Sequence, residues 1–168
     1  RDYLTVEATE RALAMVHGGD DYRPLGRLVD ERAIVNAIVG LLATGGSTNH
    51  TLHLVAIAKA AGVIVNWDDF SDLSQAVPLL ARIYPNGPAD VNHFHNAGGL
   101  GFVIRELLDA GLLHEDILTV APQGFREYTA HPALRDDSLV WNELPVESGD
   151  SDIVRGYEDP FQCNGGMS

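Results

Sequence analysis

Two adjacent glycines break a strongly helical part of the chain, and this break constrains the fold more than any other feature of the sequence. Apolar residues at three- and four-residue spacing predict a first helix over residues 30–42 and a second helix shortly after it. Gly45 and Gly46 end the first helix, and Ser47 or Thr48 can cap the second. The sequence therefore predicts two helices joined by a tight glycine turn.

The apolar positions of these two helices indicate which faces should be buried. In each helix they recur along one side, which is the pattern of a helix that packs one face against a core. The expected core residues are Ile34, Ile38, Leu41 and Leu42 in the first helix, and Leu52, Val55, Ala56 and Ala60 in the second.

Short apolar runs that alternate with helical segments predict an α/β fold. Helical spacing marks residues 6–16 and 101–110. Short buried strands are expected at 63–66, within 81–87, where a Pro-Asn-Gly turn ends the strand, and at 117–120. Strands separated by helices favour a parallel sheet with helices packed on it. We therefore expect a three-layer α/β/α arrangement around a small, mostly parallel sheet.

The pattern weakens after Ala121, which suggests a division of the chain. Residues 1–121 are predicted to form an α/β domain segment. Residues 122–168 are polar and contain prolines, and only Phe125–Tyr128 and Ser138–Trp141 indicate short elements. We expect this second part to be a loop-rich tail that leads toward a further domain.

The charge balance and the cysteine content narrow the classes of partner. The 168 residues carry a formal charge of -13 with only 11 Lys plus Arg, so the long-range field repels nucleic acid and anionic membranes. The single cysteine, Cys163, cannot build a disulfide framework or a multi-thiolate metal site. The sequence contains no run of about eighteen apolar residues, so it does not predict a membrane-spanning helix. We expect a cytoplasmic protein without a nucleic-acid or membrane partner.

The glycine turn is also the first candidate binding site. A helix start preceded by two glycines presents free backbone N–H groups and the positive end of the helix dipole to an anion. Polar side chains beside it can add directional hydrogen bonds to a phosphate or carboxylate. The alternative is a plain helix cap that binds nothing. The candidate residues are Gly45, Gly46, Ser47, Thr48, Asn49 and His50.

A second candidate lies in the stretch ADVNHFHNAGGLG, which contains Asn92, His93 and His95. In an extended segment the two histidines point to one face, and the glycines that follow allow a turn into the next helix. This stretch could form a second helix start that faces an anion. Two alternatives remain: the imidazoles join His50 and His53 around a metal ion, or they are structural.

Two longer stretches carry a resemblance to a known family. They are LLATGGSTNHTLHLVAIAKAAGVIVNWDDFSDLS and ARIYPNGPADVNHFHNAGGLGFVIRELLDAGLLHEDILTV. They closely resemble the middle of the dehydratase family that contains 6-phosphogluconate, dihydroxy-acid and sugar-acid dehydratases, and the likeness runs from about Arg1 to at least Phe161. The forms GGSTNH, NWDDFSDLS and VNHFH are similar to the phosphogluconate branch, because dihydroxy-acid dehydratases usually have Ala at the position of His50.

The resemblance implies a hydro-lyase of the Entner–Doudoroff pathway that converts 6-phosphogluconate to 2-keto-3-deoxy-6-phosphogluconate. It further implies an iron–sulfur cluster, expected to be 4Fe-4S, that acts as a Lewis acid on the departing hydroxyl, together with a magnesium ion and a homodimeric assembly. The substrate carries a carboxylate and a phosphate. The resemblance therefore assigns residues 45–50 to substrate binding, with Asn92, His93 and His95 as a second set.

The resemblance also implies that the chain is an internal fragment, the latter part of the family's N-terminal domain. The family's cysteine ligands and magnesium-associated residues lie upstream of the matched part, its base lies in a downstream domain, and Cys163 falls where the family has something like proline. We therefore expect no catalytic residue, metal ligand or bound cofactor in this chain. Other interpretations are a dihydroxy-acid or other sugar-acid dehydratase, or a non-catalytic scaffold or dimerisation segment.

Overall fold

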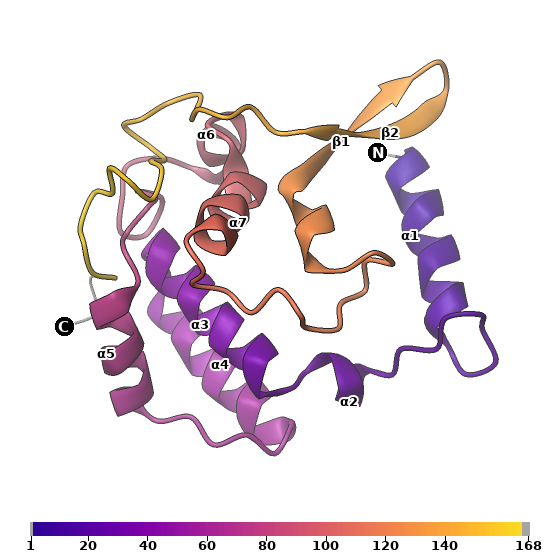
Figure 1. The fold of residues 1–168 in the computed structure, drawn as a ribbon, viewed down its shortest axis with the longest axis horizontal. Coiled ribbons are helices and arrows are strands. Elements are labelled where there is room, and N and C mark those ends of the chain that lie inside the picture. Colours follow the sequence, from indigo (N-terminus) through magenta and orange to yellow (C-terminus); the bar gives the residue numbers. More distant parts are fainter. Residues whose placement is uncertain (1, 166–168) are drawn as a thin grey trace.

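Helices dominate the computed structural model, which describes residues 2–165. Figure 1 shows α3, α4, α5 and α7 gathered on one side of the molecule, with α1 standing apart on the other. The elements are α1 (Asp2–Met15), α2 (Leu25–Leu28), α3 (Glu31–Thr44), α4 (Thr48–Ala60), α5 (Trp67–Ala76), α6 (Val91–Asn96), α7 (Gly99–Asp109), the 3-10 helix η1 (Phe125–Thr129), β1 (Ala130–Arg135) and β2 (Ser138–Glu143).

The helix predicted after residue 30 is the centre of the core. Asp30 caps α3, because its carboxylate accepts a hydrogen bond from the Ala33 amide at 2.8 Å. The predicted buried residues of this helix are confirmed, and α4, α5 and α7 all pack against it. Its buried residues are Ile34, Asn36, Ile38, Val39, Leu41, Leu42 and Ala43.

The predicted buried face of α4 is wrong. The helix turns Thr51, Leu54 and Ala58 inward, whereas Leu52 and Ala56 are exposed. Ala60 is exposed as well, and Val55 is half-buried against the core. The apolar spacing of this helix fits more than one face, so the spacing alone did not select the side that packs against the core.

The mixed α/β class is confirmed, but the expected three-layer arrangement around a mostly parallel sheet is wrong. Among residues 2–165 the sheet is a two-stranded antiparallel hairpin of β1 and β2, paired from Ala130 with Glu143 to Arg135 with Ser138. Asp136 and Asp137 form its turn, with φ angles of 47° and 57°. The expected elements at 125–128 and 138–141 are confirmed as η1 and β2.

The segments predicted as strands, residues 63–66, 81–87 and 117–120, are connections. Ala81 and Ile83 make only isolated bridges, with Val154 and Ala89. Some of their apolar side chains cover helices: Val63 and Val65 pack against the core, and Ala81 is buried in it. A short apolar run has no period that separates a strand from a buried connection.

The last described segment returns to the core. Val154 is completely buried, and its neighbours pair with the connection after α5. The Arg82 amide donates to the Ile153 carbonyl at 2.8 Å, and the Arg155 amide donates to the Leu80 carbonyl at 2.8 Å. The structure thus ties residues 150–165 to the α3 region, while the proposed division at residue 121 stays a prediction.

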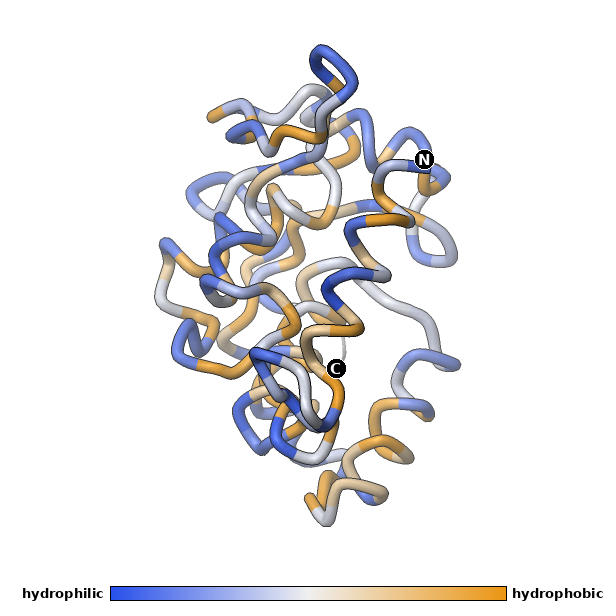
Figure 2. The backbone as a smooth tube through the Cα atoms, turned by 90° about the vertical axis from the view of Figure 1, so that its right-hand side faces the viewer, coloured by the Kyte–Doolittle hydropathy of each residue, from blue (hydrophilic) through white to orange (hydrophobic). Residues whose placement is uncertain are grey.

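The first helix stands away from the core. No residue of α1 is buried, and its attachment is largely polar. Arg11 of α1 pairs with Asp21 at 2.8 Å and donates to the Val120 carbonyl. Arg23, in the connection after α1, donates to the Thr119 and Ala121 carbonyls at 2.7 and 2.9 Å. Figure 2 shows that hydrophobic residues lie on the outlying helices as well as in the centre of the molecule. No helix within residues 2–165 is long and apolar enough to cross a membrane.

Candidate functional site

The turn between α3 and α4 requires both of its glycines. Gly45 ends α3 in the left-handed region, with a φ of 63°, where a side chain on an L-residue is strained. Gly46 has an ordinary φ, but a side-chain carbon there would collide with Leu41 and lie 3.3 Å from His50 Nδ1. The turn therefore brings the start of α4 close to the end of α3, as the sequence predicted.

Asn86 holds this turn from outside, and the sequence analysis missed it. Its side-chain amide donates to the Gly45 carbonyl and, at 3.0 Å, to the Gly46 carbonyl. Asn86 lies in the Pro-Asn-Gly turn, which was interpreted only as the end of a strand. A side-chain donor that reaches two carbonyls about 40 residues away leaves no local pattern in the sequence.

Ser47 acts as the cap that the simpler interpretation expected. Its hydroxyl oxygen accepts a hydrogen bond from the His50 amide at 3.2 Å. The amides of Thr48 and Asn49 begin the helix and have no acceptor within residues 2–165. Thr48, Asn49 and His50 are exposed, so these amides and side chains are accessible to an anion.

His50 also lines a mostly apolar pocket of about 340 Å³ between α3 and α7. Thr44 at the end of α3 and Leu100 in the first turn of α7 lie on its wall. The start of α4 therefore combines polar groups with an apolar flank, which is the usual composition of a small-molecule site.

The second candidate set folds differently from its prediction. Residues 91–96 are the helix α6 and not an extended segment, so His93 and His95 do not share a face. Asp90 caps this helix and accepts hydrogen bonds from the Asn92 and His93 amides at 2.8 and 2.9 Å. The hydrogen bond from the His93 amide is the main cause that lowers the pKa of the Asp90 carboxyl. The capping residue Asp90 indicates the helical structure of residues 91–96, whereas the alternation of histidines suggested an extended segment.

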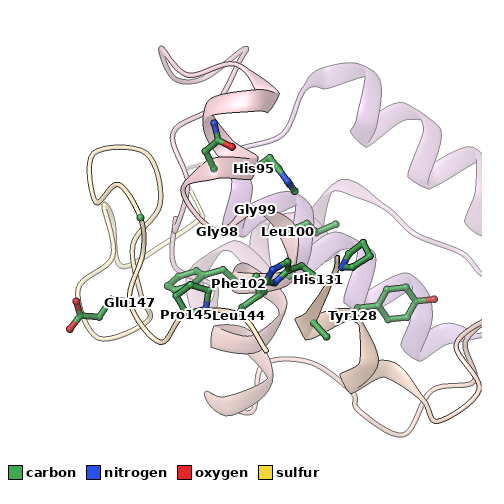
Figure 3. A pocket seen from close by; sticks show the side chains of 15 residues that line it. His95, Gly98, Gly99, Leu100, Phe102, Tyr128, His131, Leu144, Pro145 and Glu147 are labelled. Atoms are coloured by element: carbon green, nitrogen blue, oxygen red, sulfur yellow. The ribbon is translucent and has the colours of Figure 1, made fainter. Parts of the chain in front are cut away.

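His95 lines another pocket, of about 510 Å³, at the start of α7. Figure 3 shows His95 beside Gly98, Gly99 and Leu100, with His131 on the same pocket. No side chain caps α7, and the buried Nδ1 atom of His131 has no hydrogen-bond partner in the described part of the chain. His131 is a second polar residue that the sequence analysis missed.

Leu100 lies on both pockets and connects the two candidate sets. His50 lines one pocket and His95 the other, so the structure brings part of each set to neighbouring cavities. Asn92 and His93 are exposed and line neither of these pockets. The arrangement suits an anionic ligand held by backbone amides and imidazoles near the starts of α4 and α7.

The metal interpretation finds no geometric support among residues 2–165, where no three His, Cys, Asp or Glu side chains are placed to share an ion. The donor set also does not fit an iron–sulfur cluster. Such a cluster typically takes three protein thiolates when one iron stays open to substrate, and this chain has one cysteine, the exposed Cys163.

Comparison with known proteins tests the resemblance found in the sequence. The dihydroxy-acid/6-phosphogluconate dehydratase N-terminal family matches residues 1–128. The chain belongs to this family. It is 55% identical over 166 residues to the phosphogluconate dehydratase of Escherichia coli (strain K12), and 58% identical over 168 residues to that of Zymomonas mobilis. The resemblance is confirmed.

The family members also show how much of a relative this chain represents. Each of these two matches covers 99% of the chain and 28% of the relative, so the chain spans little more than a quarter of their length. A dihydroxy-acid dehydratase of Parasynechococcus marenigrum is 40% identical over 147 residues, or 87% of the chain and 24% of that protein. The phosphogluconate dehydratases are the more similar of these relatives.

Proposed function

We propose that this chain is part of a hydro-lyase that converts 6-phosphogluconate to 2-keto-3-deoxy-6-phosphogluconate in the Entner–Doudoroff pathway. The observation that carries the proposal is its 55–58% identity to phosphogluconate dehydratases along 99% of the chain, against 40% to a dihydroxy-acid dehydratase. A dihydroxy-acid or other sugar-acid substrate is the second candidate, because the matched family includes both kinds of dehydratase.

Within that reaction the chain's own residues bind and orient the substrate. The amides of Thr48 and Asn49 and the side chains of Asn49 and His50 hold an anionic group of the sugar acid. His95 and the uncapped start of α7 hold a second group across Leu100. A local site of this kind is needed because the overall charge of -13 repels an anionic substrate.

The chemical step is assigned to residues beyond this chain. An iron–sulfur cluster of the 4Fe-4S type, when bound, would supply a Lewis acid for the C3 hydroxyl, and a magnesium ion is the second expected cofactor. The single thiolate of the chain does not fit the cluster, so a longer polypeptide must provide the ligands. We also propose a cytoplasmic homodimer, in which this segment alone is inactive.

The assay compares 6-phosphogluconate with a dihydroxy acid in a protein of the relatives' length that contains this sequence. We expect keto-acid formation with higher kcat/KM for 6-phosphogluconate. Asn49→Ala should raise KM about tenfold or more, since a hydrogen bond to a charged group is lost. Gln75→Ala, an exposed amide on α5, is the control. Preference for the dihydroxy acid would select the second candidate, and unchanged kinetics of Asn49→Ala would remove the substrate assignment.

A further inference from the structure

Asparagine is followed directly by glycine at two places in the chain, Asn86–Gly87 and Asn164–Gly165. This dipeptide is chemically labile, because a glycine has no side chain to keep its amide nitrogen away from the asparagine side chain. Attack of that nitrogen on the side-chain carbonyl carbon forms a cyclic imide and expels ammonia, which takes up the amide proton. Water then opens the imide to aspartate or isoaspartate.

The attacking amide is free at the first place and hydrogen-bonded at the second. The Gly87 N–H has no acceptor within residues 2–165, and residues 84–86 beside it are exposed. The Gly165 N–H donates to the Ser74 carbonyl at 2.8 Å, and Gly165 is buried. A bonded amide must break its hydrogen bond before it can attack, so the structure favours reaction at Asn86.

The leaving nitrogen of Asn86 lies among hydrogen-bond acceptors. Its side-chain amide donates to the Gly45 carbonyl and, at 3.0 Å, to the Gly46 carbonyl. Carbonyl oxygens at this position stabilise the nitrogen as it gains a proton, which is the form in which it departs. The same two contacts connect the reaction to the turn between α3 and α4.

The fold requires both residues of this labile pair. Asn86 supplies the donor that holds the glycine turn. A side-chain carbon at Gly87 would collide with the backbone carbonyl of Arg82, so no larger residue fits after Asn86. The lability therefore follows from the packing of this part of the chain.

The product of the reaction reverses the polarity of the contact with the turn. An ionised carboxylate has no hydrogen to donate, so it would face the Gly45 and Gly46 carbonyls as an acceptor. It also adds a negative charge to a chain that already carries -13. The turn would lose its donor and gain a repulsive group at the point where α4 begins.

We propose that Asn86 is a site of spontaneous deamidation, and that its conversion to aspartate or isoaspartate loosens the turn between α3 and α4. The start of α4 then becomes less ordered as the protein ages. The effect of this change on substrate binding rests on the proposed function, because the exposed Thr48 and Asn49 belong to the candidate substrate site. The modification itself needs only water and the residues of this turn.

Peptide mapping by mass spectrometry tests the modification in a protein of the relatives' length that contains this sequence. The folded protein is incubated in mildly alkaline buffer, and the aspartate and isoaspartate content at Asn86 and Asn164 is measured over time. We expect conversion at Asn86 to be about tenfold faster or more, because the reaction at Asn164 first costs a backbone hydrogen bond. Equal or slower conversion at Asn86 would overturn the proposal and show that its two donated hydrogen bonds protect it.

Unfolding provides the control for this comparison. In denaturant the amides of Gly87 and Gly165 are both released from the fold, so the two rates should approach each other. A ratio that is unchanged in denaturant would assign the difference to the neighbouring sequence, and the structural explanation would be wrong.

Asn86→Asp reproduces one product and tests its effect on the turn. We expect hydrogen–deuterium exchange of the His50 and Thr51 amides, which both donate to Ser47, to be about fivefold faster than in wild type. Asn164→Asp adds the same charge elsewhere and should leave this exchange unchanged. Circular dichroism checks that both variants keep their helices. Exchange that stays at the wild-type rate in Asn86→Asp would overturn the proposal.

Enzyme kinetics distinguish a failure of this proposal from a failure of the proposed function. If the start of α4 binds the substrate, KM for 6-phosphogluconate should rise in Asn86→Asp together with the exchange rate. Faster exchange at constant KM would support the loosening of the turn and overturn the substrate assignment at α4.

Discussion

At the scale of single residues, the candidate site depends on groups of two kinds. Gly45, Gly46 and Ser47 are recognisable in the sequence because their roles are local: a left-handed φ, a close approach to Leu41 and a helix cap. Asn86 is of the other kind, because it acts on a turn far away in the chain. Residues with local roles can be predicted from the sequence, whereas a residue that acts through a contact far away in the chain cannot.

Replacement of Asn86 should show how much it contributes to the turn. Asn86→Ala removes the donor to the Gly45 and Gly46 carbonyls, so we expect the free energy of unfolding to fall by about 1 kcal/mol. Chemical denaturation measures this change, with Gln123→Ala as a control that truncates an exposed amide in another loop. Equal stability of the two variants would show that the turn is held by its glycines alone.

At the scale of elements, capping residues predicted helix positions better than apolar spacing predicted helix faces. Asp30 and Ser47 start α3 and α4 as expected. The hydrogen bonds at the start of α6 show why the extended interpretation of the histidines failed: Asp90 caps a helix there. A cap acts within one turn, whereas the buried face of a helix depends on what lies beside it.

The cap of α3 should make stability depend on pH. The amide of Ala33, with Arg32 in a smaller role, lowers the pKa of the Asp30 carboxyl in the folded protein. The ionised form is therefore favoured by folding, and its contribution is present above the unfolded pKa and lost as the pH falls through the folded one. We expect wild type to lose stability relative to Asp30→Asn below pH of about 4.

Denaturant titrations of wild type and Asp30→Asn at several pH values measure this difference. The asparagine keeps an oxygen that can accept from the Ala33 amide, so the variant retains the cap and loses only the titration. A difference between the two proteins that does not change with pH would contradict the role of the ionised carboxylate.

At the scale of the whole molecule, distant segments close the core. Val154 lies in the part predicted to be a loop-rich tail, yet it is completely buried and bridges to Ala81. A polar, proline-containing stretch gives no periodic signal for a single buried valine. Such contacts join residues more than seventy positions apart and follow from packing of the assembled helices.

Truncation of Val154 measures how strongly this closure stabilises the molecule. Val154→Ala removes buried carbon atoms and leaves a small cavity, so we expect a loss of about 2 kcal/mol in the free energy of unfolding. Val146→Ala is the matched control, because Val146 is 85% exposed and should contribute little. Thermal or chemical denaturation that gives the same stability for both variants would show that residues 150–165 are not part of the cooperative core.

The sequence by itself determined the family, the starts of α3 and α4, the glycine turn and the buried face of α3, because these follow from local chemistry and from repeated spacing within one element. The tertiary structure decided the rest. It showed that the short apolar runs are connections, that Asn86 holds the turn, and that Leu52 and Ala56 of α4 are exposed. These features depend on which surfaces meet in space. Apolar spacing indicates a helix face that is suited to burial, but it does not indicate which surface that face packs against.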